Sequence, residues 1–188
     1  RLTGYKLRKV STSRVARSGI SGARLPLNRL GDHWALDIEP DVMAALCGRE
    51  LLADIVRGTG EAVRAYIPQI GIDPGAVGQP AVVGADQWGE SLLLDGFTPQ
   101  LAIRKGWMFT VVRDTLPSLH VVSAEVIADA DGAADVSFWP LLRSATPDNT
   151  AIEMAEPWIQ GSIDDGGDHE TGVAPALKMG GFTIEEEG

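Results

Sequence analysis

Short apolar segments separated by turn residues fill residues 81–139, and this pattern constrains the fold more than any other feature of the sequence. Residues 119–128 alternate between two sets of side chains, which is typical of a β-strand whose two faces meet different surroundings. The Asp-Ala-Asp-Gly sequence at residues 129–132 predicts a tight turn in which Gly132 supplies the positive φ. A further strand at residues 136–139 follows. This succession predicts an antiparallel β meander.

Other parts of the chain carry the same strand pattern. The clearest is residues 33–39, where Trp34, Leu36 and Ile38 alternate with mostly polar residues. The remaining apolar segments bounded by Gly, Pro and Asp predict strands at residues 81–83, 87–95 and 107–112, whereas residues 62–67 form a segment that leads into a turn-rich region.

Residues 42–57 are the one stretch whose apolar residues recur at helical spacing. The stripe consists of Val42, Ala45, Leu46, Leu52, Ala53 and Val56. Asp41 is suited to cap the N-terminus of this helix, and Arg57 with Gly58 is suited to its end. The sequence therefore predicts a mainly β (α+β) fold, a β-sandwich-like antiparallel meander with one α-helix near residues 42–57.

Charge divides the chain into segments. Residues 1–29 carry 8 of the 16 Lys and Arg residues and none of the 26 acidic residues, which leaves a net charge of −18 on the remainder. We expect a basic N-terminal arm or edge strand at residues 1–29, a β-sandwich-like domain with one helix at residues 30–160, and an acidic, glycine-rich C-terminal tail at residues 161–188.

Two interpretations of this charge pattern remain open. The basic arm could bind nucleic acid, whose affinity grows with each phosphate neutralised. Alternatively, the basic arm and the acidic body are complementary surfaces of neighbouring copies in an oligomer. We favour the second, because Tyr5 is the only aromatic residue of the arm that could stack on a base. Residues 185–187, all Glu, are expected to be solvated unless a basic neighbour orders them.

The single cysteine and the lengths of the apolar runs limit disulfide bonding and membrane spanning. Cys47 cannot form an internal disulfide, and we expect it to be a small buried hydrophobic residue on the helix. No apolar run approaches the roughly 18–20 residues that a membrane-spanning helix needs. We therefore expect no membrane span.

A search for catalytic, cofactor or metal residues assigns none. His33, His120 and His169 lie far apart with no spacing typical of a metal site. No motif marks a nucleophile or a phosphate loop. Asp129 and Asp131 lack the further ligands of a calcium loop, whereas residues 164–170 hold enough acidic side chains that a cation site there stays open. We expect a non-enzymatic protein without a cofactor.

Five tryptophans remain to be explained. They are Trp34, Trp88, Trp107, Trp139 and Trp158. Aromatic residues on a β scaffold can form a sugar-binding surface, but they more often fill cores or anchor subunit interfaces. We favour the core or an interface.

Several short segments resemble, in order, the distal tail proteins of long-tailed, siphovirus-type bacteriophages. The first is residues 81–96, in which a strand ending in Gly84-Ala85 leads through a loop to Ser91-Leu92 and Asp95-Gly96. The others are residues 105–111 (Lys-Gly-Trp-Met-Phe-Thr-Val), 119–122 (Leu-His-Val-Val) and 131–143, which end in Pro-Leu-Leu-Arg. Trp107 stands where this family usually has Asp.

The resemblance covers roughly residues 30–160, most clearly 81–143. It implies a structural virion protein that forms a ring, commonly a hexamer, at the tail tip or baseplate. Such a ring joins the tail tube protein to the tail-tip hub and fibre proteins, and it is assembled in the host cytoplasm. The resemblance implies no catalytic residue, and the basic first 29 residues and the acidic last 30 or so depart from the family pattern. We expect no nucleic-acid partner.

Two rival functions follow from the residues. The first alternative is a carbohydrate-binding module that presents tryptophans to host-surface glycans. The second, which we favour least, is a metal-dependent hydrolase that uses the acidic side chains of residues 164–170.

Overall fold

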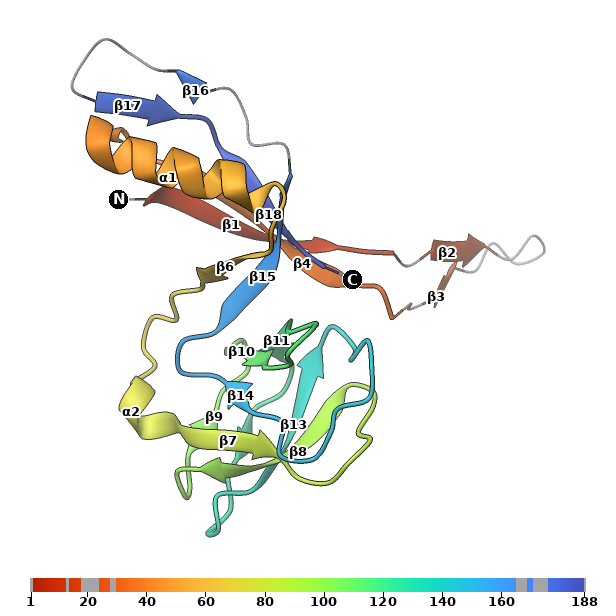
Figure 1. Ribbon diagram of the computed structural model, residues 1–188. Helices are drawn as coiled ribbons and strands as arrows, with labels where there is room; N and C mark the ends of the chain where they lie inside the picture. Colours follow the sequence, from red (N-terminus) through yellow and green to blue (C-terminus); the bar gives the residue numbers. More distant parts are fainter. Residues whose placement is uncertain are drawn as a thin grey trace. The chain divides into compact units, whose positions relative to one another are not determined.

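The computed structural model describes residues 2–12, 14–17, 24–27, 30–164, 169–170 and 176–187. It confirms the mainly β class, with many antiparallel strands and one helix of more than one turn. The chain forms two compact units (Figure 1). Unit 1 comprises residues 1–9, 34–65 and 159–187, and unit 2 comprises residues 10–33 and 66–158 with Gly188.

A five-stranded sheet forms the framework of unit 1. Its order is β1 (Leu2–Val10), β4 (His33–Pro40), β18 (Phe182–Glu186), β15 (Trp158–Asp164) and β6 (Val63–Tyr66). The antiparallel register places Ile184 of β18 opposite Leu36 of β4 on one side and Ile163 of β15 on the other. All three side chains are buried, so one face of the sheet is apolar.

Helix α1 (Ala45–Gly58) packs against this apolar face through its C-terminal half (Figure 1). Ile55 is buried, and Gly58 lies close to the side chains of Ile163 and Val63. A Cβ at Gly58 would lie 2.6 Å from one Ile163 carbon and 2.7 Å from one Val63 carbon. The glycine that ends the helix therefore also lets the helix approach the sheet.

The predicted helix is confirmed near its expected position, but three details of that prediction are wrong. The helix begins after a short strand, β5 (Met43–Ala44), and Ala44 rather than Asp41 is its N-cap residue. The Asp41 carboxylate accepts a hydrogen bond from the Val42 N–H instead. Leu46 and Val56 of the predicted stripe are exposed, because the sheet meets the Ile55 side of the helix. Cys47 is also exposed rather than buried.

Two small sheets are also present, the first within unit 1 and the second within unit 2. One contains β16 (His169–Glu170), β17 (Ala176–Met179) and β5. The other is a two-stranded antiparallel hairpin of β2 (Arg14–Arg17) and β3 (Arg24–Leu27). At the base of this hairpin the Asp32 carboxylate accepts hydrogen bonds from the Ser11 hydroxyl (3.1 Å) and from the Thr12 N–H (2.9 Å). These bonds tie together the two segments that enter and leave the hairpin.

Unit 2 contains a six-stranded antiparallel sheet. Its order is β14 (Ile152–Glu153), β10 (Met108–Val111), β11 (Ser118–Val122), β13 (Ala134–Trp139), β8 (Ser91–Phe97) and β7 (Gly78–Val82). An antiparallel bridge between Ala81 and Ala151 joins the first and last strands, so the sheet is nearly closed and barrel-like. A short strand pair, β9 (Ala102–Ile103) with β12 (Val126–Ile127), and the one-turn helix α2 (Pro74–Val77) complete the unit.

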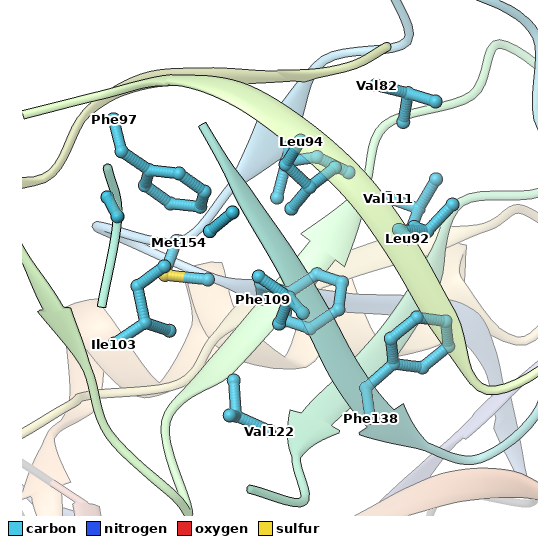
Figure 2. Close-up of a cluster of buried hydrophobic side chains, with 14 of the residues drawn as sticks. Val82, Leu92, Leu94, Phe97, Ile103, Phe109, Val111, Val122, Phe138 and Met154 are labelled. Atoms are coloured by element: carbon cyan, nitrogen blue, oxygen red, sulfur yellow. The ribbon is translucent and has the colours of Figure 1, made fainter. Parts of the chain in front are cut away.

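The core of unit 2 lies inside this sheet (Figure 2). Phe109 and Phe138 are almost fully buried and meet edge to face, with ring centroids 5.5 Å apart. Leu92, Val111 and Val122 are equally buried beside them. The short apolar segments predicted as strands at residues 81–139 thus supply inward-facing residues of one core. The single strand expected at residues 119–128 is instead divided between β11 and β12, which belong to different sheets.

The C-terminal residues contribute strands to unit 1, where the sequence suggested a tail. Residues 161–164 belong to β15, and β18 lies between β4 and β15 in the sheet. Glu186 is 2% exposed, and its carboxylate accepts a hydrogen bond from the Trp34 N–H. The structure therefore divides the chain differently from the three expected segments, because unit 1 joins residues from both termini.

Candidate functional site

The histidines form no catalytic group in the described part of the chain. His33 and His120 are buried, and each Nδ1 donates a hydrogen bond of 2.8 Å to a backbone carbonyl, that of Gly31 or that of Pro140. His169 lies on β16, and its side chain is outside the described residues. The two histidines that can be placed have structural partners rather than a shared substrate site.

His120 is enclosed by aromatic rings and faces arginines. Its ring stacks on Phe109 and meets Phe138 edge to face, and its Nε2 accepts a hydrogen bond from the Ser118 hydroxyl. Burial, together with the charges of Arg143 and Arg113, lowers the pKa of His120 to about 3, although the hydrogen bond to the Pro140 carbonyl opposes the shift. The imidazole is therefore neutral at physiological pH and stabilises the core in that form.

The acidic positions singled out in the sequence divide into two cases. Asp129 accepts hydrogen bonds from the N–H groups of Asp131 and Ala133, and Gly132 has a φ of 79°. This geometry confirms the predicted turn. Residues 165–168, the centre of the possible cation site at residues 164–170, lie outside the described residues. Elsewhere in the described chain, no three His, Cys, Asp or Glu side chains are placed to hold a metal ion.

Most of the tryptophans do not form an exposed surface. Trp158 is buried, and Trp107 packs against the core of unit 2. Trp34 and Trp139 are half-buried. Trp88 is the one tryptophan with more than half of its surface exposed, at 55%. A sugar-binding surface built from several tryptophans has therefore no counterpart within one copy of the chain.

The sheet of unit 1 has a polar side on which β1 meets β4. Arg8 of β1 forms a salt bridge of 3.2 Å with Asp37 of β4, and the Thr183 hydroxyl donates to the same carboxylate. Burial alone would raise the pKa of Asp37, but the hydrogen bonds from Thr183 and Arg8, with the charges of Arg8 and Lys6, lower it overall. One of the basic side chains of β1, Arg8, is therefore paired with an acidic side chain of the same chain.

A second acidic area lies where β15 and β18 end. Asp164, Glu185 and Glu187 surround a hollow of about 390 Å³, with Thr59 and Ser162 beside them. The hollow is lined almost entirely by carboxylates and hydroxyl groups. This composition fits a cationic surface better than an apolar one.

An apolar cleft of about 520 Å³ opens between α1 and the sheet of unit 1. Its floor includes Ile55, Ile163 and Phe182. Arg57 and Glu61 lie at its lining and form an exposed salt bridge of 2.7 Å, which is expected to contribute little to stability. No catalytic pair of side chains is found among the described residues of this cleft.

The loop that follows β6 is a further candidate surface. Gln69 Nε2 donates to the carbonyls of Met108 (3.0 Å) and Met154 (2.7 Å), while Gln69 Oε1 accepts from the Met108 N–H (2.6 Å). The Ile67 N–H also donates to the Pro157 carbonyl at 2.8 Å. These bonds fix residues 67–69 against β10 and the chain around β14. This arrangement could not be predicted from local sequence, because the bonded residues are 39 and 85 positions away from Gln69.

We expect Gln69→Leu to lower the free energy of unfolding of the chain by about 2 kcal/mol, because it leaves the Met108 N–H and two carbonyls without their partner. Urea unfolding followed by tryptophan fluorescence measures this change. Gln79→Leu is the matched control, since Gln79 is exposed on β7. An equal loss in both variants would show that the hydrogen bonds of Gln69 do not stabilise the loop.

No protein-family model and no curated protein matches this chain. No helix in the described part of the chain is long and apolar enough to cross a membrane. The features that remain as candidates for function are therefore surfaces: a basic strand and hairpin, an acidic hollow, an apolar cleft and the braced loop after β6.

Proposed function

We propose that this chain is a non-enzymatic structural subunit of a phage tail tip. It forms a ring, most simply a hexamer, that joins the tail tube protein to the hub and fibre proteins. The observation that carries the proposal is the separation of charge onto different elements. The edge strand β1 has Lys6, Arg8 and Lys9, and the hairpin of β2 and β3 has three arginines, with no acidic residue in either element.

The acidic residues lie on other elements. Asp164, Glu185 and Glu187 surround the hollow in unit 1, and further exposed carboxylates follow in unit 2. Opposite charges on separate surfaces of one chain favour a head-to-tail contact, in which a patch of one copy meets a different patch of the next. A contact of this type closes into a ring when the rotation between copies permits.

Two further features support the proposal. The segments that resemble distal tail proteins, residues 81–143, occupy the barrel-like sheet of unit 2 from β7 to β13. In addition, β1 and β6 are the two edges of the five-stranded sheet of unit 1. Exposed edges of this kind are commonly covered by a neighbouring chain in an assembly.

The test is the native mass of the purified chain by light scattering, at low and at physiological salt. We expect one closed species of about six copies, which dissociates as salt rises because screening weakens contacts between exposed charges. A mass of 20.0 kDa at every salt concentration, both alone and with tail tube and hub proteins, would contradict the proposal.

The exposure of Trp88 supports a second candidate, binding of a host-surface glycan in unit 2. Quenching of tryptophan fluorescence by a panel of oligosaccharides tests it, with Trp88→Ala as the comparison. Quenching that disappears in this variant would favour the glycan-binding function. Quenching that is absent from both proteins would eliminate it.

A further inference from the structure

The loop after β6, which the hydrogen bonds of Gln69 hold in place, contains a fully exposed isoleucine. Ile70 has a relative exposure of 101%. It lies between Gln69, which makes three hydrogen bonds to distant backbone groups, and Gly71, whose φ is 89°. An apolar side chain in water is unfavourable, and here the chain is held so that the exposure persists. Such a rigid apolar projection is typical of an anchor residue in a protein–protein contact.

The surface around Ile70 is also apolar and hollowed. Tyr66 is 67% exposed, and Pro68 is exposed beside it. A groove of about 440 Å³ runs along the loop, lined by Tyr66, Pro68, Ile72 and Glu156 among others. We call this groove together with Ile70 the loop surface. It offers both a projecting side chain and a recess for a side chain of a partner.

The segments that form the loop surface carry only negative charges. Residues 66–77 and 147–158, which contain the loop and the neighbouring chain, have no Lys or Arg. They contain four acidic residues, and three of them, Asp73, Asp148 and Glu156, are exposed. A partner that fits this surface therefore carries apolar side chains together with basic ones.

We propose that the loop surface receives the hairpin of β2 and β3 from a second copy of this chain. The hairpin strands combine three arginines with apolar residues and contain no acidic residue: Arg14, Val15, Ala16 and Arg17 in β2, and Arg24, Leu25, Pro26 and Leu27 in β3. This composition matches an acidic apolar surface. The proposal rests on the ring assembly proposed above and names the surface through which neighbouring copies meet.

The acidic hollow of unit 1 is the competing receptor for the hairpin. Its lining holds four carboxylates and two hydroxyl groups but only one apolar side chain, Ile163, which is itself buried. The loop surface combines carboxylates with apolar side chains and a recess, so it matches both the arginines and the apolar residues in the composition of the hairpin.

Substitution of Ile70 tests the proposal without disturbing the fold, because the side chain is fully exposed. We expect Ile70→Ser to raise the protein concentration at which the assembly half dissociates by about tenfold or more, from the lost burial of one large apolar side chain. Ile127→Ser is the matched control, since Ile127 is 59% exposed on β12. It is expected to assemble like the wild type, as measured by light scattering over a dilution series.

A charge reversal tests the acidic part of the surface. We expect Glu156→Arg to weaken association and Glu125→Arg, an exposed residue elsewhere in unit 2, to leave it unchanged. A wild-type chain that assembles while Ile70→Ser and Glu156→Arg assemble equally well would overturn this proposal and leave the ring standing. A wild-type chain that stays monomeric at every salt and concentration would overturn it together with self-assembly into a ring.

A double-mutant cycle identifies the occupant of the loop surface. Leu25→Ser in the hairpin and Ile70→Ser are measured separately and together. If the two residues meet across the interface, the combined variant loses less affinity than the product of the two separate fold-changes. If the effects simply multiply, the hairpin is not the occupant, and the assignment of the second copy's hairpin is wrong.

Discussion

Gly132→Ala is expected to unfold unit 2 under conditions in which the wild type is folded, with a loss of about 3 kcal/mol or more in the free energy of unfolding. Two causes combine at this position. Gly132 has a φ of 79°, a conformation that costs an L-residue roughly 1–2 kcal/mol. A Cβ there would also overlap the carbonyl oxygen of Phe97, which is backbone and cannot move aside alone.

The substitution at Gly132 also affects the core of unit 2. The Gly132 carbonyl accepts a hydrogen bond of 3.1 Å from the Phe97 N–H, and Phe97 belongs to the core of unit 2. A shift of the turn therefore strains β8 as well as the hairpin that leads to β13. Thermal and urea unfolding of the variant, followed by near-ultraviolet circular dichroism, measure the loss.

Gly106→Ala is the matched control for this experiment. Gly106 has a φ of 91°, but a Cβ at that position would meet no atom within 4 Å. We therefore expect it to show only the conformational cost of roughly 1–2 kcal/mol. The difference between the two variants isolates the steric contribution at Gly132. Equal losses would show that the close approach to Phe97 does not matter.

Acid is expected to destabilise unit 2 well above the pH at which carboxylates titrate. His120 has a folded-state pKa of about 3, below its ordinary value of 6.5. Between these values the unfolded chain binds a proton that the folded chain excludes, so the free energy of unfolding falls as pH falls. The full contribution of neutral His120 is present above pH 6.5. We expect a loss of about 2 kcal/mol between pH 6.5 and 5, since one unit of pKa corresponds to about 1.4 kcal/mol.

His120→Phe separates this effect from other titrations. The variant keeps a ring beside Phe109 and Phe138 but leaves the Ser118 hydroxyl and the Pro140 carbonyl without their partner. We expect it to be less stable than the wild type at pH 8, by about 1–3 kcal/mol, and to vary less with pH between 6.5 and 5. Urea unfolding at a series of pH values measures both. The same slope in wild type and variant would show that His120 is not the responsible group.

The strands and turns of unit 2 could be predicted from local sequence because their signals are local. The strand β11 was predicted because its short apolar segment is bounded by turn residues, and Gly132 is required by the positive φ of its turn. Both signals depend on residues that are close in sequence. They are therefore the same whichever strands pair with one another.

The candidate surfaces were harder to predict because they depend on contacts between distant residues. Basic residues 1–29 could be identified from the sequence, but the exposure of Ile70 could not. An apolar residue between a glutamine and a glycine is equally compatible with a buried turn. The three hydrogen bonds of Gln69 to the Met108 and Met154 backbone, with the bond from the Ile67 N–H to the Pro157 carbonyl, hold the loop with Ile70 outside.

The sequence by itself determined the mainly β class, the helix near residues 42–57 and the separation of charge, since period, turn chemistry and composition are properties of the chain. The tertiary structure alone decided which side of α1 is buried, and with it the exposure of Cys47. It also placed β18 beside β4, with Thr183 opposite Asp37. The physical reason is that burial depends on which surface packs against a residue, and that surface comes here from residues almost 150 positions away.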